Sequence, residues 1–362
     1  MPTLLFTGFP GFLGSALLPR VLARAPGDRA ACVVQAKFAA LARRRAEELV
    51  ARDPSLVGRI ELVEGDITSA SLGLADAAAL QRDTAEIFHL AAAYDLAVSR
   101  ELAMRVNVDG TREVLAFAER CPALRRFQYV STCYVSGRHP GVFREDDLER
   151  GQAFNNAYEE TKYLGEVAVQ ASMRAGLPAT IYRPSIVVGD SATGATQKYD
   201  GPYFVIRWIL RQPRVAVLPT VGDTRAHALN VVPRDFVVTA IAHLSALDRS
   251  RGRVYQLADP EPLTIDALID AVARATRRRV LRVPLPLRVA KGAIERVPGI
   301  YRLMQIPSAA VDYFVHPTRY ATDHAREDLA GSGIAAPPLI TYLATLVAFV
   351  RQHPAIGSQP ML

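Results

Sequence analysis

Tyr158 and Lys162 lie four positions apart in a polar stretch, residues 154–166, whose pattern is typical of a helix. A free phenol titrates near pH ~10, so a tyrosine by itself is a poor proton donor or acceptor at neutral pH. Residues i and i+4 share one face of a helix, and a neighbouring ammonium favours the phenolate. The pair therefore predicts that Lys162 lowers the pKa of Tyr158, so that the phenol exchanges a proton near neutral pH. Such pairs also arise by chance, so the argument depends on the surrounding elements.

Three glycines follow the first predicted strand, residues 3–7, and open a helix: Gly8, Gly11 and Gly14. A tight turn, a close approach of the backbone to a pyrophosphate and close packing of helix on strand each require a residue without a Cβ atom. The unpaired amides at the start of the helix then bind the anion. The loop predicts dinucleotide binding. The alternative is that the glycines serve only a turn.

The end of the second predicted strand, residues 31–35, indicates which dinucleotide is bound. This strand ends at Gln35, where an Asp or Glu would accept a hydrogen bond from the ribose of NAD. Lys37 follows, and three arginines lie at 43–45. A cation at this place tolerates a 2′-phosphate, so we expect NADP(H) to be favoured over NAD(H). Lys37 is the better candidate, because the arginines also fit the solvated face of a helix.

Two further polar residues are predicted to lie near Tyr158. Thr132 ends the fifth predicted strand, and Asn107 lies on the helix that follows the fourth. Strand ends at the carboxyl edge of a parallel sheet face the ligand crevice. We therefore expect Thr132 and Tyr158 to contact one carbonyl oxygen during hydride transfer, while Lys162 approaches both the phenol and the ribose of the nicotinamide.

Short β-branched runs alternate with helical patterns through the first half of the chain. The runs lie at residues 3–7, 31–35, 59–66, 85–92, 126–132 and 179–185. This alternation predicts an α/β fold with a Rossmann-type, doubly wound parallel sheet. After about residue 186 the alternation loosens. We therefore expect an NAD(P)-binding Rossmann domain at 1–185 and a smaller C-terminal substrate-binding lobe at 186–362, with elements that return to the sheet.

The composition is that of a globular protein, because 50% of the 362 residues are hydrophobic and 22% are charged. The cysteines are Cys32, Cys121 and Cys133, whose wide spacing predicts reduced, buried thiols in a cytoplasmic protein. No apolar run reaches the roughly 18 residues that a membrane span needs. The histidines are not spaced as metal ligands, so we expect no metal. His89 lies in an apolar strand and is expected to be a hydrogen-bonded core residue.

The net charge of +7 is concentrated in residues 274–302, which hold nine Arg or Lys and one Glu. One interpretation is a solvated basic face. The other is a site for an anionic partner: the phosphates of a substrate or of coenzyme A, an acidic carrier protein, or a membrane surface that the segment contacts peripherally. Two prolines interrupt the segment and no aromatic residues alternate with its arginines, so we expect no nucleic acid.

Seven motifs, in chain order, resemble the extended short-chain dehydrogenase/reductase superfamily: TGFPGFLG, GDIT, HLAA, NVDGT, VSTCYVSG, YEETK and RPSIVVG. Within that superfamily, FTGFPGFLG, FHLAAAYDL, YVSTCYVSG and NVVPRDFV are most similar to the branch of thioester reductase domains and fatty acyl-CoA reductases. The resemblance covers about residues 3–240. Its motifs are specific for the superfamily and less so for the branch.

The resemblance implies that Thr132, Tyr158 and Lys162 are catalytic and that Asn107 is mainly structural. Together with Lys37 from the argument above, the expected cofactor-binding residues are Gly8, Gly11, Phe12, Leu13, Gly14, Lys37, Asp66, Ile67, Ala91, Ala92, Tyr158, Lys162, Pro184 and Ser185.

Four of these residues have a more definite expected place. Asp66 and Ile67 would contact adenine, and Pro184 and Ser185 would lie behind the nicotinamide. For Asp66 the alternative is a turn residue without a ligand.

These features predict an NADPH-dependent oxidoreductase that reduces a carbonyl of a hydrophobic substrate, with an acyl thioester, on CoA or a carrier, or its aldehyde as candidates. The loop at 196–204 is expected to line the pocket. The alternatives are a ketone or alcohol oxidoreductase of the steroid-dehydrogenase type, a sugar-nucleotide epimerase or dehydratase, and a non-catalytic NADP-binding sensor. The missing acid at Gln35 argues against the epimerase, and the Tyr–Lys pair argues against the sensor. Superfamily members often form homodimers, so a homodimer is also expected.

Overall fold

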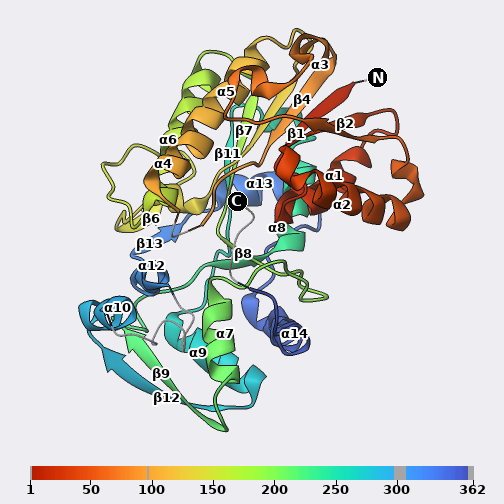
Figure 1. Ribbon diagram of the computed structural model, residues 1–362. Helices are drawn as coiled ribbons and strands as arrows, with labels where there is room; N and C mark the ends of the chain where they lie inside the picture. The colour runs from red at the N-terminus through yellow and green to blue at the C-terminus, as the bar shows by residue number, and fades with distance from the viewer. Residues whose placement is uncertain (1, 96–97, 297–306, 358–362) are drawn as a thin grey trace.

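The computed structural model describes residues 2–95, 98–296 and 307–357. At its centre lies a seven-stranded sheet with the order β11-β7-β5-β4-β1-β2-β3, in which every neighbouring pair is parallel (Figure 1). The strands are β1 (Thr3–Thr7), β2 (Arg29–Val34), β3 (Ile60–Glu64), β4 (Thr84–His89), β5 (Arg126–Val130), β7 (Ala179–Pro184) and β11 (Val254–Leu257). The predicted α/β fold with a doubly wound parallel sheet is confirmed.

Helices cover both faces of this sheet (Figure 1). One layer consists of α1 (Phe12–Leu22), α2 (Ala39–Arg52), α8 (Arg234–Leu244) and α13 (Asp323–Leu329). The other layer consists of α3 (Ala77–Asp83), α5 (Gly110–Glu119) and α6 (Ala157–Arg174). The apolar faces of the two layers pack on the sheet in two buried clusters. Removing this apolar surface from water is the main term that stabilises the fold.

Short helical turns connect these elements, many of them at the carboxyl edge of the sheet. They are η1 (Ala36–Phe38), η2 (Pro54–Leu56), η3 (Ala70–Gly73), α4 (Arg100–Ala103), the π-helical turn η4 (Met104–Asp109), η5 (Cys133–Ser136), η6 (Asp248–Ser250) and η7 (Asp312–Val315). Two of them carry residues that the sequence assigns to the site, namely Lys37 in η1 and Asn107 in η4, and Thr132 directly precedes η5.

The second half of the chain builds a smaller part, which lies below the sheet in Figure 1. Its strands form two parallel pairs, and a third pair lies beside the sheet: β8 (Ile186–Val188) with β10 (Val231–Pro233), β9 (Val215–Val221) with β12 (Arg279–Leu285), and β6 (Gly141–Phe143) with β13 (Thr318–Tyr320). Its helices are α7 (Pro202–Leu210), α9 (Ile265–Thr276), α10 (Leu287–Arg296), α12 (Ser308–Val311) and α14 (Leu339–Gln352). Apolar side chains of α7, α9 and α14 form a separate core. The division of the chain at residue 185 stays a prediction.

Several strands end earlier than the sequence predicts. β2 ends at Val34, β4 at His89 and β5 at Val130. Gln35 and Thr132 therefore lie in turns beyond the carboxyl edge of the sheet. The apolar run continues past each strand because the following turn is itself buried or half-buried. Hydrophobicity alone therefore does not mark where strand pairing ends.

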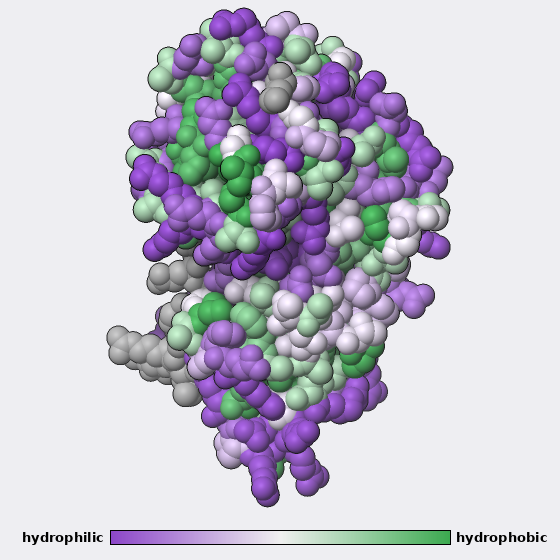
Figure 2. Space-filling model, turned by 90° about the vertical axis from the view of Figure 1, so that its right-hand side faces the viewer, coloured by the Kyte–Doolittle hydropathy of each residue, from purple (hydrophilic) through white to green (hydrophobic). Residues whose placement is uncertain are grey.

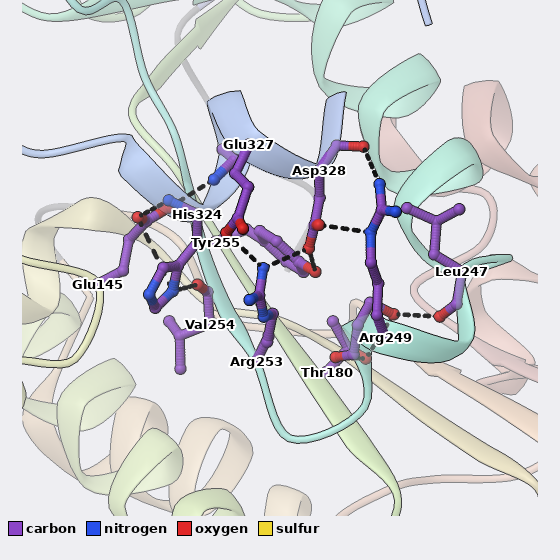
Figure 3. Close-up of polar contacts among 12 residues, drawn as sticks. Glu145, Thr180, Leu247, Arg249, Arg253, Val254, Tyr255, His324, Glu327 and Asp328 are labelled. Atoms are coloured by element: carbon purple, nitrogen blue, oxygen red, sulfur yellow. Dashed lines mark hydrogen bonds and ion pairs between the residues drawn. The ribbon is translucent and has the colours of Figure 1, made fainter. Parts of the chain in front are cut away.

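The edge strand β11 comes from the second half of the chain and is covered by α13 through a polar network (Figure 3). Asp328 accepts hydrogen bonds from Arg253 at 2.8 Å and from the Tyr255 hydroxyl at 2.5 Å, and it pairs with Arg249 at 2.6 Å. Glu145 accepts from backbone amides of both β11 and α13. These contacts cover the edge that β11 would otherwise expose for pairing with another strand.

The three cysteines are buried and free, as the sequence predicts. Burial raises the pKa of the Cys32 and Cys133 thiols, so they are inert at neutral pH. Within the described ranges, no helix has both the length and the apolar character for crossing a membrane. The same residues contain no group of three potential metal ligands.

Candidate active site

A cavity of about 710 Å³ lies at the carboxyl edge of the sheet, between the glycine loop and the smaller part of the molecule. All but one of the site residues that the sequence predicts line it. They are Gly8, Gly11, Phe12, Leu13, Gly14, Lys37, Asp66, Ile67, Ala91, Ala92, Thr132, Tyr158, Lys162, Pro184 and Ser185. The exception is Asn107. The fold therefore brings residues from most of the chain to one place.

Side chains do not fit at the three glycine positions of the loop, because each lies close to backbone atoms. A Cβ atom on Gly8, whose φ is +89°, would lie 2.8 Å from the amide nitrogen of Ala91. One on Gly11 would lie 2.7 Å, and one on Gly14 2.5 Å, from the carbonyl oxygen of Gly8. Gly11 is also the N-cap of α1 and has no side chain to occupy the first amides. Those amides are therefore available to an anion.

The other end of the cavity holds Asp66, Gln35 and Lys37. The Asp66 carboxylate accepts hydrogen bonds from the amide and the hydroxyl of Thr68, both at 2.9 Å. Burial raises the pKa of Asp66, but these bonds, a bond from Gln35 and the charge of Lys37 outweigh it and leave that pKa below its usual value. Asp66 thus closes a turn and also lines the cavity, and its contact with adenine stays a prediction. The Lys37 ammonium lies near Asp66, and its nitrogen is 5.0 Å from the centre of the Phe38 ring.

Thr132 and Tyr158 both line the cavity, and the Thr132 hydroxyl lies close enough to the phenol to lower its pKa. Thr132 is the N-cap of η5, and its hydroxyl accepts from the amide of Tyr134 at 3.2 Å. Tyr158 lies in the first turn of α6, which begins at the N-cap Asn156. These two helix starts fix the backbone at both hydroxyls, so the fold sets their mutual distance.

The predicted lowering of the Tyr158 pKa is wrong, because that pKa lies above its usual value. Burial raises the pKa of Tyr158 to about 12, the Thr132 hydroxyl lowers it by less, and the charges of Glu159 and Asp200 raise it further. Desolvation of the phenolate therefore decides the direction of the shift. The phenol stays protonated at neutral pH.

The Lys162 ammonium is directed toward β5. It donates to the carbonyl oxygen of Val130 at 2.9 Å and to the hydroxyl of Tyr129 at 3.1 Å, and it lies 4.5 Å from the centre of the Tyr129 ring. Burial lowers the pKa of Lys162 to about 7, although the Glu166 carboxylate raises it. A small change in the surroundings of Lys162 therefore changes the charge of its amine at neutral pH.

Asn107 lies behind the cavity wall, in the π-helical turn η4. Its side-chain oxygen accepts from the amide of Ala93 at 2.8 Å, and its nitrogen donates to the carbonyl of Ala93 and the hydroxyl of Thr161, both at 3.0 Å. It thereby connects the loop after β4 to α6. This placement agrees with a structural role.

His89, at the end of β4, is a hydrogen-bonded core residue, as predicted. Its Nδ1 lies 2.8 Å from the hydroxyl of Thr7 and its Nε2 3.1 Å from that of Thr111. The Thr111 hydroxyl donates to the carbonyl of Asn107 and the Thr7 hydroxyl accepts from backbone amides, so a neutral ring protonated on Nε2 satisfies every partner. Burial, followed by the charge of Lys162, lowers the pKa of His89 to about 3 and keeps it neutral.

The smaller part of the molecule closes the cavity opposite the sheet. Thr196, Gln197, Lys198, Asp200 and Phe204 line it, so the loop predicted as a pocket wall lies there. Lys198 pairs with Asp200 at 3.0 Å and lies 4.8 Å from the centre of the Tyr94 ring.

Sequence reasoning missed several lining residues, one of them inside the motif VSTCYVSG. Tyr134 follows Thr132 and packs edge-on against Tyr313, with ring centres 4.7 Å apart. Tyr313 and Phe314 reach the cavity from more than 150 residues further along the chain, and the Tyr313 hydroxyl accepts from Asn156 at 3.1 Å. The aromatic character of "DYF" at 312–314 was the only signal in the sequence.

The fold is a doubly wound sheet whose first turn is a glycine loop, and the carboxyl edge of this sheet holds two hydroxyls and a lysine. Together these features define the class of extended short-chain dehydrogenases/reductases. The chain belongs to the male sterility protein family of this class, since the model of that family matches residues 6–241. It is an NAD(P)-dependent oxidoreductase. The resemblance seen in the sequence is thereby confirmed.

Curated relatives include reductases and peptide synthetases. The chain is 29% identical over 281 residues to one of the linear gramicidin synthase proteins of Brevibacillus parabrevis, which covers 74% of the chain and 5% of the relative. It is 28% identical to the large chain of the L-2-aminoadipate reductase of Penicillium chrysogenum, covering 66% and 18%. It is 25% identical to an aldehyde reductase of Aspergillus flavus, covering 77% and 29%. The chain thus spans less than a third of each of these relatives.

Among solved structures, the terminal R domain of the myxalamid PKS-NRPS biosynthetic pathway superposes with a TM-score of 0.83 at 26% identity, over 98% of this chain and 91% of that one. A thiolation-reductase di-domain of an archaeal non-ribosomal peptide synthetase gives 0.74 at 19% identity, over 98% and 76%. The second similarity concerns the fold alone.

Proposed function

We propose that this protein uses NADPH to reduce a carbonyl of a hydrophobic acyl substrate, either a thioester on CoA or a carrier domain, or the corresponding aldehyde. The observation that carries the proposal is that the buried Thr132 and the half-buried Tyr158 lie close together in a cavity that the glycine loop also lines. Relatives named as an aldehyde reductase and an aminoadipate reductase, and an R domain as structural neighbour, support this reaction class.

The residues present fit a nicotinamide dinucleotide. The glycine loop leaves room for backbone only, and its helix offers free amides to a pyrophosphate. Among the described residues, the Ser185 hydroxyl is buried without a hydrogen-bond partner and lines the cavity, where a carboxamide would satisfy it. The bound nicotinamide supplies the hydride.

The protein side of the reaction follows from the protonation states. Thr132 and the protonated phenol of Tyr158 donate hydrogen bonds to the substrate oxygen, where negative charge develops. Tyr158 then delivers its proton, and a phenol that stays protonated at neutral pH suits this reductive direction. The Lys162 ammonium, held on β5, stabilises the phenolate that remains. With a thioester, the hemithioacetal then collapses and the thiol leaves.

Replacing Tyr129 with Phe is expected to shift the pH dependence of turnover to lower pH. Lys162 is charged below its pKa of about 7 and neutral above it. Removing the Tyr129 hydroxyl takes away an acceptor of the ammonium, which lowers this pKa further, so the charged form is lost at a lower pH. Since a hydrogen bond to a charged group contributes ~1.5–3 kcal/mol, turnover at pH ~7 falls about tenfold and recovers on acidification.

A pH profile of kcat checks this result. The control is Tyr182→Phe, which removes another buried hydroxyl of the same sheet, bonded to Gln128 at 2.8 Å and outside the cavity. An unchanged pH profile for Tyr129→Phe, or an equal change in the control, contradicts the role given to Lys162.

Preference for NADPH is proposed to depend on Lys37. The sequence has no acid at Gln35, and the structure brings Lys37 to the same end of the cavity as Asp66. Lys37→Ala is expected to raise KM for NADPH about tenfold and to leave KM for NADH within about twofold, because only NADPH carries the 2′-phosphate. Arg43→Ala, an exposed cation on α2 outside the cavity, is the control. Equal losses with both dinucleotides would remove Lys37 from 2′-phosphate recognition.

The hydrophobic substrate is proposed from the cavity wall opposite the sheet, where Phe204, Ala310 and Phe314 lie. A carrier-linked form of the substrate is supported by the thiolation-reductase fold neighbour and by the peptide synthetases among the relatives. A cytoplasmic location agrees with the three reduced, buried thiols. The homodimer stays a prediction.

The proposed function is tested by following NADPH absorbance with a panel of acyl-CoAs, acyl-carrier thioesters, aldehydes, ketones and secondary alcohols. We expect turnover with long acyl thioesters, their aldehydes, or both. Turnover confined to ketones or alcohols would favour the steroid-dehydrogenase-type alternative. Tight NADPH binding with no turnover on any class would favour a sensor.

A further inference from the structure

An exposed apolar strip runs along one face of the β9–β12 ribbon. The parallel register places Val217 beside Leu281 and Pro219 beside Val283. Residues that alternate along a strand point to opposite faces, and Ala216 and Leu218 of β9 are buried. The opposite face carries aliphatic residues that remain exposed: Val215 (46%), Val217 (43%), Leu281 (56%) and Val283 (42%). A contiguous apolar strip of this kind on a protein surface indicates a binding surface.

Cations are concentrated in the two strands of this strip and their flanks. Residues 205–222 and 271–294, which contain both strands and their flanks, hold ten Arg or Lys and no Asp or Glu. Arg279 extends the strip on β12, opposite Val215, and Arg214 and Arg277 are exposed nearby. Within the described part of the chain, these three arginines form no ion pair. Arg282, in contrast, pairs with Asp266 and Asp270 of α9.

The two figures show where this end of the ribbon lies. The start of β9 and the turn before β12 form the lower tip of the molecule in Figure 1. The same tip is coloured hydrophilic in the side view of Figure 2. Residues 297–302 of the basic segment identified in the sequence lie outside the described residues.

Apolar side chains continue from the strip to the cavity. The ends of the two strands, Val221 and Leu285, pack in one cluster with Phe204, Ala310 and Phe314. The last three residues also line the cavity. The face of the ribbon and the proposed substrate pocket therefore share one apolar cluster.

We propose that the outer face of the β9–β12 ribbon docks on an anionic lipid surface. A bilayer offers a uniformly negative surface to the arginines and hydrocarbon to the aliphatic strip, which match the two properties of this face. A second copy of the chain is disfavoured, because the exposed Arg214, Arg277 and Arg279 would face the same arginines of the other copy. Nucleic acid would leave the strip without an apolar partner. Hot spots of protein interfaces are enriched in Trp, Tyr and Arg but poor in Val and Leu, which are the exposed apolar residues of this strip.

The proposal rests on the proposed function in one respect, namely that a hydrophobic substrate reaches the cavity from the bilayer. Docking itself needs no turnover. A binding measurement therefore fails or succeeds independently of whether the protein reduces acyl thioesters.

The test is co-sedimentation of the full chain with vesicles of phosphatidylcholine mixed with phosphatidylglycerol, and with vesicles of phosphatidylcholine alone. We expect binding to the anionic vesicles only, weakened by added salt. Leu281→Asp is expected to weaken binding about tenfold or more, and Arg279→Glu about fivefold for each unit of charge changed. Both side chains are exposed, so an unchanged melting temperature verifies folding.

Two matched controls lie elsewhere on the surface. Val57→Asp changes an aliphatic residue that is 66% exposed, and Arg43→Glu reverses an exposed arginine of α2. Both are expected to bind vesicles as the wild type does. The proposal is overturned if the wild type ignores anionic vesicles, or if Leu281→Asp binds them unchanged. It is also overturned if the wild type binds an isolated acidic carrier domain instead of vesicles, and Leu281→Asp and Arg279→Glu lose that binding.

Discussion

Replacing Tyr158 with Phe is expected to lower kcat by about 10²- to 10⁴-fold while the affinity for NADPH changes little. The substitution removes one hydroxyl from a half-buried ring at the cavity wall and leaves the side-chain volume almost unchanged. The lost hydroxyl is the proposed proton donor and, with Thr132, one of two hydrogen-bond donors to the developing oxyanion. The substitution is therefore expected to slow the chemical step rather than to weaken NADPH binding.

Single-turnover kinetics together with a binding titration separate these two quantities. Tyr163→Phe is the matched control, because Tyr163 lies on the same helix and packs against Phe154 outside the cavity. The control is expected to turn over at the wild-type rate. A Tyr158→Phe variant with the wild-type rate would show that the proton comes from another group.

Replacing Gly14 with Ala is expected to weaken NADPH binding by about one to two orders of magnitude. The new Cβ atom would lie 2.5 Å from the carbonyl oxygen of Gly8 and 3.2 Å from the amide of Phe9. Both contacts are with backbone, so the loop itself must move. Moving it misaligns the amides at the start of α1, and a hydrogen bond to a charged group contributes ~1.5–3 kcal/mol.

A titration of NADPH against protein fluorescence measures this loss. Gly292→Ala in α10 is the control, because its Cβ would meet nothing within 4 Å. It is expected to keep the wild-type affinity and melting temperature. If Gly14→Ala also keeps that affinity, the anion does not bind at this loop.

Much of the fold follows from local sequence patterns, because parallel strands buried on both faces are continuous apolar runs separated by helices. Six strands of the central sheet are recognisable in this way. The seventh, β11, was not, because four residues after a loop carry too little periodicity to be distinguished from the interior of another element. Its place depends on the contacts of Asp328 and Glu145, which no local pattern encodes.

The site was predictable where motifs carry it and not where burial decides its chemistry. Spacing correctly placed Tyr158 and Lys162 on one helix facing the same cavity. It could not show that Lys162 binds Val130 and Tyr129, or that desolvation raises the pKa of Tyr158. Both depend on how deeply the first turns of α6 are buried, which is a property of the whole fold.

The most direct test of hydride transfer at this site uses NADPH deuterated at C4, prepared separately as each of its two stereoisomers. A long-chain acyl thioester or its aldehyde is the substrate, and the product is analysed by mass spectrometry. The account predicts one deuterium per reduction step from one stereoisomer only, with the transfer abolished in Tyr158→Phe. Product without deuterium from either stereoisomer, or equal transfer from both, would contradict it.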